Sequence, residues 1–156
     1  MVHYYYWLIP DPPHRSALQQ TIDKFAQVYG GPRFEPHITL GSGTNIPSPP
    51  PPLLPAPSIS LNSVQSEENY FRNLYYTCAE TEALTSLRTY FSNEDHFVPH
   101  LSLVYGQHSA ARRRDWCSHL PLYTKTILCS EIWIVTGGAN INAWAPLIKY
   151  PLNRPS

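Results

Sequence analysis

The stretch Pro36-His37-Ile38-Thr39-Leu40 occurs a second time, with small changes, as Pro99-His100-Leu101-Ser102-Leu103. Each copy alternates polar and apolar side chains, which is typical of a β-strand with one buried face. In each strand the histidine and the hydroxyl residue share one face, and the two aliphatic residues point into the core. In a chain of this composition the pattern His, apolar, Ser or Thr, apolar is expected by chance roughly 0.2 times. Its two copies therefore indicate an internal duplication.

The polar face of the two copies carries the groups that acid–base chemistry on a phosphate ester needs. One imidazole accepts a proton, a second one donates a proton, and hydroxyls donate to the phosphoryl oxygens. A single histidine on a strand is more often structural than catalytic, and it is the repetition that favours catalysis. We therefore predict that His37 and His100 are catalytic and that Thr39 and Ser102 bind the substrate.

The residues around the two copies predict the same order of elements, a helix, a loop and a histidine strand, in both halves of the chain. Apolar residues at helical spacing predict helices over 15–29, 81–91 and 109–120. Runs rich in β-branched and aromatic residues predict strands over 4–9, 58–64, 70–78, 126–136 and 143–150. Residues 44–57 are rich in proline, which removes backbone donors, so they are predicted to form an extended surface loop.

These elements predict one domain over residues 1–156, of the α+β class. We expect two lobes related by the internal duplication, with two mainly antiparallel sheets around a central cleft and the helices on the outside. One histidine strand from each lobe then meets the other at the cleft.

Composition narrows the classes of partner and the compartment. Eleven basic and eleven acidic residues leave no net charge, which argues against a non-specific polyanion binder and is compatible with a small anionic substrate. Three cysteines, an odd number without metal-ligand spacing, indicate reduced thiols. No stretch has the leader or the apolar length of a targeting or membrane segment. We expect a cytoplasmic protein, with the nucleus as the alternative, and no membrane partner.

The stretches Gly31–Leu40 and Val98–Tyr105 resemble the two motifs of the cyclic phosphodiesterases, a family of the two-histidine phosphoesterase superfamily. The similarity extends to the opening aromatic strand and to the closing hairpin with Trp144. It implies a bilobal α+β protein with a central cleft and without a required metal. We expect a monomer without a cofactor. The implied reaction is ring-opening hydrolysis of ADP-ribose 1″,2″-cyclic phosphate or of a nucleoside 2′,3′-cyclic phosphate, the latter giving a 2′-phosphate.

Carried onto this chain, the resemblance implies that His37 and His100 are the catalytic pair and that Thr39 and Ser102 bind the phosphoryl oxygens. It makes His100 the base that activates water and His37 the acid, with the reverse assignment left open. It also implies that Tyr105 stacks on the substrate. Strict alternation puts Tyr105 on the face opposite His100, so this role requires a bulge or a strand end.

Three alternatives remain open at this point. The chain is also consistent with a phosphodiesterase acting on RNA 3′ ends or with a 2′,5′-RNA ligase-like enzyme of the same superfamily. A third alternative is a nucleotide-binding module without catalysis, although a mere binder has no need of two proton-transfer groups. A zinc site is disfavoured because the three cysteines lack metal-ligand spacing.

Overall fold

The structure, a computed structural model, describes residues 2–46, 53–91 and 98–155. The strands of these residues are β1 (Tyr4–Ile9), β2 (Ile38–Gly43), β3 (Ser58–Ile59), β4 (Leu61–Gln65), β5 (Leu74–Cys78), β6 (His100–Val104), β7 (Ile127–Leu128), β8 (Glu131–Thr136) and β9 (Ala145–Pro151). The helices are α1 (Pro12–Tyr29), α2 (Glu82–Phe91) and α3 (Ala110–His119), with short 3₁₀ turns η1 (Tyr70–Arg72) and η2 (Ile141–Ala143).

Seven of the strands form one sheet in the order β4-β5-β6-β2-β1-β8-β9, and every pairing in it is antiparallel. Strands β3 and β7 form a separate pair. The two histidine strands, β2 and β6, are neighbours at the centre of the large sheet. They share a single residue pair in register, Ile38 opposite Leu101, whereas the ladders on either side are longer.

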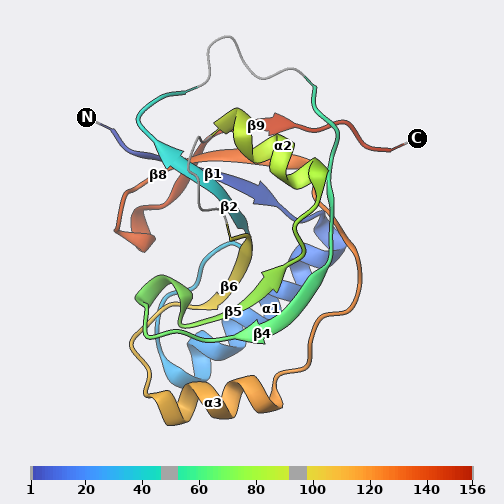
Figure 1. Cartoon of the computed structure of the whole chain (residues 1–156). Helices are drawn as coiled ribbons and strands as arrows, with labels where there is room; N and C mark the ends of the chain where they lie inside the picture. The colour runs from blue at the N-terminus through green and yellow to red at the C-terminus, as the bar shows by residue number, and fades with distance from the viewer. Residues whose placement is uncertain (1, 47–52, 92–97, 156) are drawn as a thin grey trace.

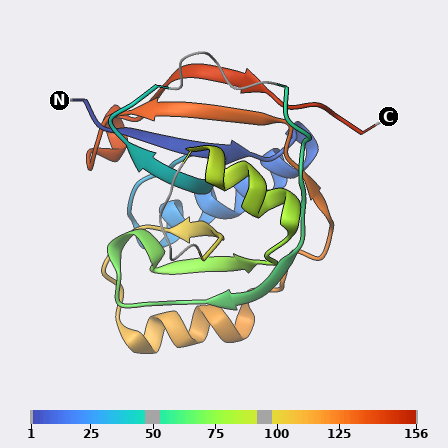
Figure 2. The same ribbon diagram turned by 45° about the horizontal axis from the view of Figure 1, so that its top comes forward.

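The large sheet therefore has two halves joined at a short seam (Figure 1). Figure 2 shows β9, β8, β1 and β2 together in the upper half of the view, and β6, β5 and β4 in the lower half. The predicted α+β class and the mainly antiparallel pairing are confirmed, with the two sheets continuous through β2 and β6. Each half contains one histidine strand.

One face of this sheet carries the main core. Ile38 and Leu101 are fully buried at the seam and belong to the same apolar cluster as residues of all three helices. The helical members of this cluster include Leu18, Ile22, Leu84, Leu87 and Trp116. Helix α1 starts with prolines, whose fixed φ suits the first helical turn, and ends before Gly30, whose φ of 78° disfavours a side chain. The alternation seen in the sequence thus directs the aliphatic residues toward the helices.

A second, smaller apolar cluster lies on the opposite face of β1 and β8. It consists of Trp7, Ile9, Trp133 and Val135, with Tyr5 and Trp144 packed against it. These residues alternate with core residues along their strands, so β1 is apolar on both faces. The cluster gives this face of the upper half a rigid aromatic surface.

Strand prediction was wrong at the start of 70–78. Residues Tyr70–Arg72 form η1 instead, and β5 begins only at Leu74. The side chain of Asn69 accepts a hydrogen bond from the Phe71 backbone N–H at 3.0 Å, which satisfies a donor that a strand partner would otherwise take. Local capping by an asparagine therefore overrides the β-propensity of the two aromatic residues.

Two predicted loops fall largely or partly outside the described residues. These are the centre of 44–57, at 47–52, and most of the segment before the second histidine strand, at 92–97. At the described end of the first segment, Pro55 bridges Asn153, and the Ala56 backbone N–H donates to the Asn153 carbonyl at 2.9 Å. The proline-rich loop itself stays a prediction. Among the helices the structure describes, none has the length and apolar character needed to cross a membrane.

Candidate active site

All five residues that the sequence singles out line one pocket of about 150 Å³. These are His37, Thr39, His100, Ser102 and Tyr105. The pocket lies at the seam between the two halves of the sheet, on the face opposite the main core. Residues from the two copies of the pattern, separated by more than sixty positions in the chain, thus share one cavity.

The pairing of β2 with β6 accounts for this convergence. Ile38 faces Leu101, and extending that antiparallel register by one position to either side sets His37 against Ser102 and Thr39 against His100. Because successive side chains alternate between faces, all four polar residues lie on the face that Ile38 and Leu101 do not use. The two patterns are related by a local two-fold arrangement, as an internal duplication predicts.

Each imidazole is oriented by the backbone of its own strand. The Nδ1 atom of His37 lies 2.6 Å from the Glu35 carbonyl oxygen, and the Nδ1 atom of His100 lies 3.1 Å from the Val98 carbonyl oxygen. A carbonyl only accepts, so in both rings Nδ1 carries the proton and donates it. The Nε2 atom of each neutral ring is then the basic nitrogen. Both histidines are prepared in the same tautomer by the same contact, two residues upstream.

The surroundings of His37 disfavour its protonation. Its side chain is only 5% exposed, and its ring stacks on Trp7 with centroids 3.7 Å apart and 11° between planes. Burial lowers the pKa of His37 from 6.5 to about 4, partly offset by the Glu35 carbonyl and reinforced by His100. At neutral pH His37 is therefore the neutral imidazole.

His100 lies in a more exposed and more polar setting. Burial again lowers its pKa, the Val98 carbonyl raises it, the Arg72 charge lowers it and the Glu67 charge raises it. The Tyr75 ring meets the His100 ring edge to face at 5.5 Å, and the Tyr75 hydroxyl donates to Glu67 at 2.7 Å. Glu67 also pairs with Arg72 at 3.4 Å. The charges of Glu67 and Arg72 thus act on the pKa of His100.

The two hydroxyls of the pocket differ in their bonding. Ser102 Oγ donates to the Phe71 carbonyl oxygen at 2.7 Å, which ties η1 to β6. Among the described residues no hydrogen bond holds the hydroxyl of Thr39. A hydroxyl has only one proton to donate. The hydroxyl proton of Thr39 is therefore available for a ligand, whereas Ser102 must first break its hydrogen bond to the Phe71 carbonyl oxygen.

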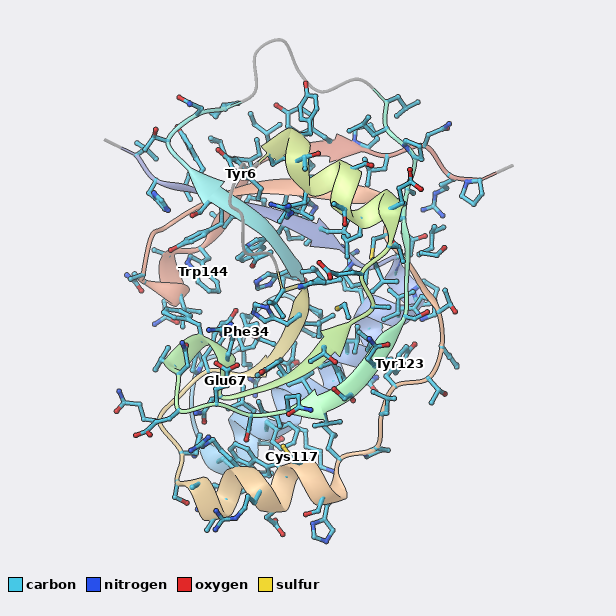
Figure 3. The ribbon with its side chains drawn as sticks, in the orientation of Figure 1. Tyr6, Phe34, Glu67, Cys117, Tyr123 and Trp144 are labelled. Atoms are coloured by element: carbon cyan, nitrogen blue, oxygen red, sulfur yellow. The ribbon has the colours of Figure 1, made fainter. Side chains whose placement is uncertain are left out.

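Tyr105 reaches the pocket because β6 ends at Val104, which satisfies the strand end that its predicted role required. Its ring is buried and stacks on Phe34 at 3.9 Å, and this burial raises the pKa of its phenol. In Figure 3, Phe34 lies between Trp144 and Glu67, close to β6.

Four further aromatic residues line the same pocket and were not identified as site residues from the sequence. They are Tyr5, Trp7, Phe71 and Trp144. A signal exists for two of them, because Tyr5 and Trp7 alternate on the strand that pairs with β2, and Trp7 faces Thr39. Phe71 and Trp144 come from η1 and from the end of η2, where no periodicity marks them. The site is consequently more aromatic than the motifs alone indicate.

Other histidines stand apart from this pocket. His3, His14, His108 and His119 are absent from its lining, and His96 lies outside the described residues. Over 2–46, 53–91 and 98–155, no three His, Cys, Asp or Glu side chains gather as metal ligands. Metal independence of the reaction stays a prediction.

The chain is similar to known proteins in sequence and in fold. No family model matches the chain. A curated 2′,3′-cyclic-nucleotide 3′-phosphodiesterase of Phaeosphaeria nodorum is 31% identical over 131 residues, an alignment that covers 64% of this chain and 66% of that protein. The chain thus spans just under two thirds of the length of this relative.

Solved structures match the chain almost end to end. Escherichia coli LigT complexed with phosphate has a TM-score of 0.63 at 11% identity, with 97% of this chain and 98% of that chain covered. LigT complexed with 3′-AMP scores 0.64 with the same identity and coverage. The protein TT0787 of Thermus thermophilus scores 0.61 at 16% identity, with 96% and 97% covered. These matches show that the chain has the fold of LigT and TT0787, and the fungal relative shows that it is similar in sequence to a cyclic-nucleotide phosphodiesterase.

Proposed function

We propose that this chain is a cyclic phosphodiesterase that hydrolyses nucleoside 2′,3′-cyclic phosphates to 2′-phosphates without a metal. The observation that carries the proposal is the convergence of His37, His100, Thr39 and Ser102 in one pocket through the register of β2 and β6. Two imidazoles in one tautomer, with hydroxyls between them, supply a proton acceptor, a proton donor and hydrogen bonds to phosphoryl oxygens.

The comparisons support the same class of substrate. The fungal relative is named for opening 2′,3′-cyclic nucleotides on the 3′ side, which leaves a 2′-phosphate on the product. Crystals of LigT, which share the fold, contain phosphate and 3′-AMP. A chain without net charge also suits a small anionic substrate better than a long polyanion.

The reaction requires an in-line displacement at phosphorus. A water molecule loses a proton to one imidazole Nε2 and forms a bond to phosphorus. The bond from phosphorus to the 3′ oxygen breaks on the opposite side, and that oxygen takes a proton from the second imidazole. Thr39 and Ser102 donate to the non-bridging oxygens, on which charge accumulates in the transition state. The enzyme returns to its starting state when a proton passes between the two histidines through solvent.

The environments of the two histidines favour His37 as the base and His100 as the acid, the reverse of the assignment that the resemblance implies. A general base must be neutral at the start, and the buried His37 has its pKa lowered to about 4. The acid must be protonated. Burial and the Arg72 charge lower the pKa of His100 as well, but His100 is the less buried ring, and the Val98 carbonyl and the Glu67 carboxylate offset part of this effect. Burial thus distinguishes two groups that the motifs make equivalent.

ADP-ribose 1″,2″-cyclic phosphate presents the same reacting group and is a second candidate substrate. RNA 3′ ends with a cyclic phosphate are a third. The absence of net charge favours small substrates, because long RNA is held largely by released counterions.

Phosphorus NMR tests the proposal directly. The chain is incubated in excess EDTA with uridine or adenosine 2′,3′-cyclic phosphate, with ADP-ribose 1″,2″-cyclic phosphate, and with an oligonucleotide that ends in a cyclic phosphate. We expect fast conversion of the nucleoside 2′,3′-cyclic phosphates to nucleoside 2′-phosphates in the presence of the chelator. Exclusive formation of 3′-phosphates would overturn the regiochemistry, and activity lost to EDTA and restored by a metal would overturn metal independence.

A matched variant separates catalysis from binding. A double substitution of His37 and His100 by Ala removes both proton-transfer groups and leaves the aromatic lining in place. If the unaltered chain binds a cyclic nucleotide but forms no more product than this double variant, the chain is a nucleotide-binding module rather than an enzyme.

A further inference from the structure

A groove lies between the second halves of α1 and α3, apart from the pocket at the seam. It has a volume of about 330 Å³ and is lined by one face of α1, from Thr21 to Tyr29, and by the chain from Asp115 to Pro121. None of its lining residues also lines the pocket of the two histidines. The groove is therefore a second concave surface, which the proposed function does not use.

Three aromatic rings line the groove and pack against one another. Phe25 and Tyr29 both meet Trp116 edge to face, with ring centroids 5.3 and 5.0 Å from that of the indole. Trp116 is 3% exposed, whereas Tyr29 is 37% and Val28 is 61% exposed. The groove thus combines a buried, closely packed indole with apolar side chains that are open to solvent.

The indole N–H of Trp116 has no hydrogen-bond acceptor among the described residues, although its Nε1 atom is buried. The indole of Trp144, in contrast, donates to the Gly138 carbonyl at 2.7 Å. A buried donor without a partner is unfavourable, and native proteins rarely contain one. An acceptor that reaches Nε1 from the groove therefore gains a hydrogen bond that replaces none within the protein.

The groove favours an occupant that is apolar, uncharged and rich in acceptors. Among its lining residues Asp115 and His119 already form an ion pair at 3.1 Å, and an uncharged occupant leaves this pair intact. A proline-rich segment meets these requirements, because its carbonyls accept hydrogen bonds and its prolines have no N–H to leave unpaired. Such segments are extended before they bind, and aromatic-lined grooves commonly recognise them.

The chain itself contains a segment of this kind. Residues 47–52 read Pro-Ser-Pro-Pro-Pro-Pro and carry no charge, and Leu53, which follows, is 62% exposed. The chain on either side is anchored by the bond from Tyr6 to the Asn45 carbonyl and by the pairing of residues 54–56 with Asn153. These flanking segments lie at the end of the molecule opposite to α3 in both views (Figures 1 and 2). The groove is therefore within reach of this segment only from a second copy.

We propose that the groove binds the proline-rich segment 47–54 of a second copy of this chain, with a carbonyl of that segment accepting the Trp116 Nε1 proton. Because Nε1 lies beneath the groove surface, exposed side chains of the groove shift to admit the carbonyl. Groove and segment are different surfaces, so the contact is heterologous and either closes between copies or continues from copy to copy. A contact of this size is weak, so the expected monomer persists at low concentration.

Two variants that each remove one half of the contact test this arrangement. Val28→Glu places a charge in the groove at an exposed position, and replacement of all four residues of Pro49–Pro52 by Ser removes the proline-rich stretch. Gln27→Glu is the matched control, because it adds a charge one residue away, on an exposed side chain outside the groove. Thermal unfolding verifies that all three variants fold.

Sedimentation equilibrium from about 1 μM to about 1 mM measures the association. We expect the unaltered chain and Gln27→Glu to associate as the concentration rises, with at least about tenfold weaker association in Val28→Glu and in the proline variant. An equimolar mixture of these two should form dimers and nothing larger, because each pair contains one intact groove and one intact segment. A mixture that stays monomeric at about 1 mM, or unchanged association of either variant alone, would overturn the proposal.

Nuclear magnetic resonance tests the groove directly. A peptide of residues 47–54 is titrated into the variant without the four prolines, and the Trp116 indole resonance is identified by its absence in Trp116→Phe. We expect this resonance to move downfield on binding, while that of Trp144, which is already hydrogen-bonded, stays in place. Trp116→Phe keeps a ring and should weaken peptide binding about 2- to 10-fold, the range for one hydrogen bond. A peptide with serine in place of the four prolines should leave both resonances unchanged.

The outcomes distinguish the site from its occupant. A Trp116 resonance that does not move at saturating peptide, or that moves equally with the serine peptide, would overturn the site. Binding of the proline peptide by a chain that stays monomeric at about 1 mM would overturn the second copy as the occupant and indicate a proline-rich partner instead.

Discussion

The indole of Trp7 and the imidazole of His37 lie face to face, with ring centroids 3.7 Å apart and 11° between their planes. Trp144 meets the same imidazole edge to face at 6.2 Å, and the Glu35 carbonyl binds its Nδ1 at 2.6 Å. Two rings and one hydrogen bond therefore restrict the rotation of His37. The relationship follows from β-pairing, because Trp7 faces Thr39 across β1 and β2.

Loss of this stacking should affect turnover more than binding. We expect Trp7→Leu to lower kcat roughly 10- to 100-fold, since a small misplacement of a catalytic group is costly, while KM stays within about threefold. Trp7→Phe keeps a ring face and should recover most of the loss. Trp133→Phe, in the same apolar cluster but outside the pocket, controls for general loosening. A rise in KM with unchanged kcat would contradict a positioning role.

Removal of either imidazole should abolish most of the turnover. We expect His37→Ala and His100→Ala each to lower kcat by about 10² to 10⁴, the range for proton transfer by a positioned side chain. The double variant should be little worse than the singles, because the two groups act in one step. His108→Ala, outside the pocket, is the control. Steady-state assays that show less than a tenfold loss for both singles would refute acid–base catalysis by this pair.

The dependence of kcat/KM on pH should be a bell displaced to the acid side of neutrality. With His37 as the base, the rising limb reports a pKa lowered to about 4. With His100 as the acid, the falling limb reports a pKa below its ordinary 6.5. The maximum is therefore expected between these limbs, below pH 6.5.

Two substitutions decide which limb belongs to His100. The Glu67 charge raises the pKa of His100 and the Arg72 charge lowers it, so Glu67→Gln should shift the falling limb to lower pH and Arg72→Gln should shift it to higher pH. If the rising limb moves in these same directions and the falling limb stays in place, His100 is the base.

The two hydroxyls should give different phenotypes. Ser102 Oγ already donates to the Phe71 carbonyl, so Ser102→Ala removes an internal hydrogen bond and should lower the free energy of unfolding by about 1 kcal/mol. Thr39→Val keeps the shape of its side chain and should leave stability within about 0.5 kcal/mol while lowering kcat. Denaturant unfolding and steady-state kinetics measure both. Equal loss of stability in the two variants would contradict this distinction.

Stability itself should report the burial of His37. Its pKa is about 4 in the folded chain and about 6.5 in the unfolded chain, so between these values the unfolded state binds more protons. Its contribution is therefore complete above pH 6.5 and is lost as the pH falls toward 4, by roughly 3 kcal/mol in all. Subtracting the pH profile of His37→Gln from that of the unaltered chain isolates this contribution from the carboxylates. A flat difference would refute the burial of a neutral ring.

Much of the fold and of the polar site could be predicted because both depend on alternation along single strands. Strand 4–9 has the predicted limits, and the helices agree within a few residues. The four polar residues of the two patterns share a face because a period of two leaves no alternative. The direction of a side chain can be predicted from the sequence where strand alternation alone determines it.

The aromatic part of the site was not predictable for the opposite reason. Phe71 lies in one short 3₁₀ segment and Trp144 directly follows another, and their positions depend on capping by Asn69 and on hairpin geometry rather than on periodicity. The difference in pKa between the two histidines likewise arises from tertiary burial, which two nearly identical motifs do not reveal. The two motifs are nearly identical in sequence, although their histidines lie in different environments.

The single pair of Ile38 and Leu101 at the seam limits how this protein can change its length. Inserting or deleting one residue within Pro36–Leu40 would exchange the two faces of β2, sending an imidazole into the apolar interior and an aliphatic chain toward the phosphate. Gains and losses of residues are thus tolerable only beyond the ends of the two five-residue patterns. Evolutionary change in chain length is thereby restricted to the connecting segments, whose variation can reshape the rim of the pocket without displacing the reacting groups.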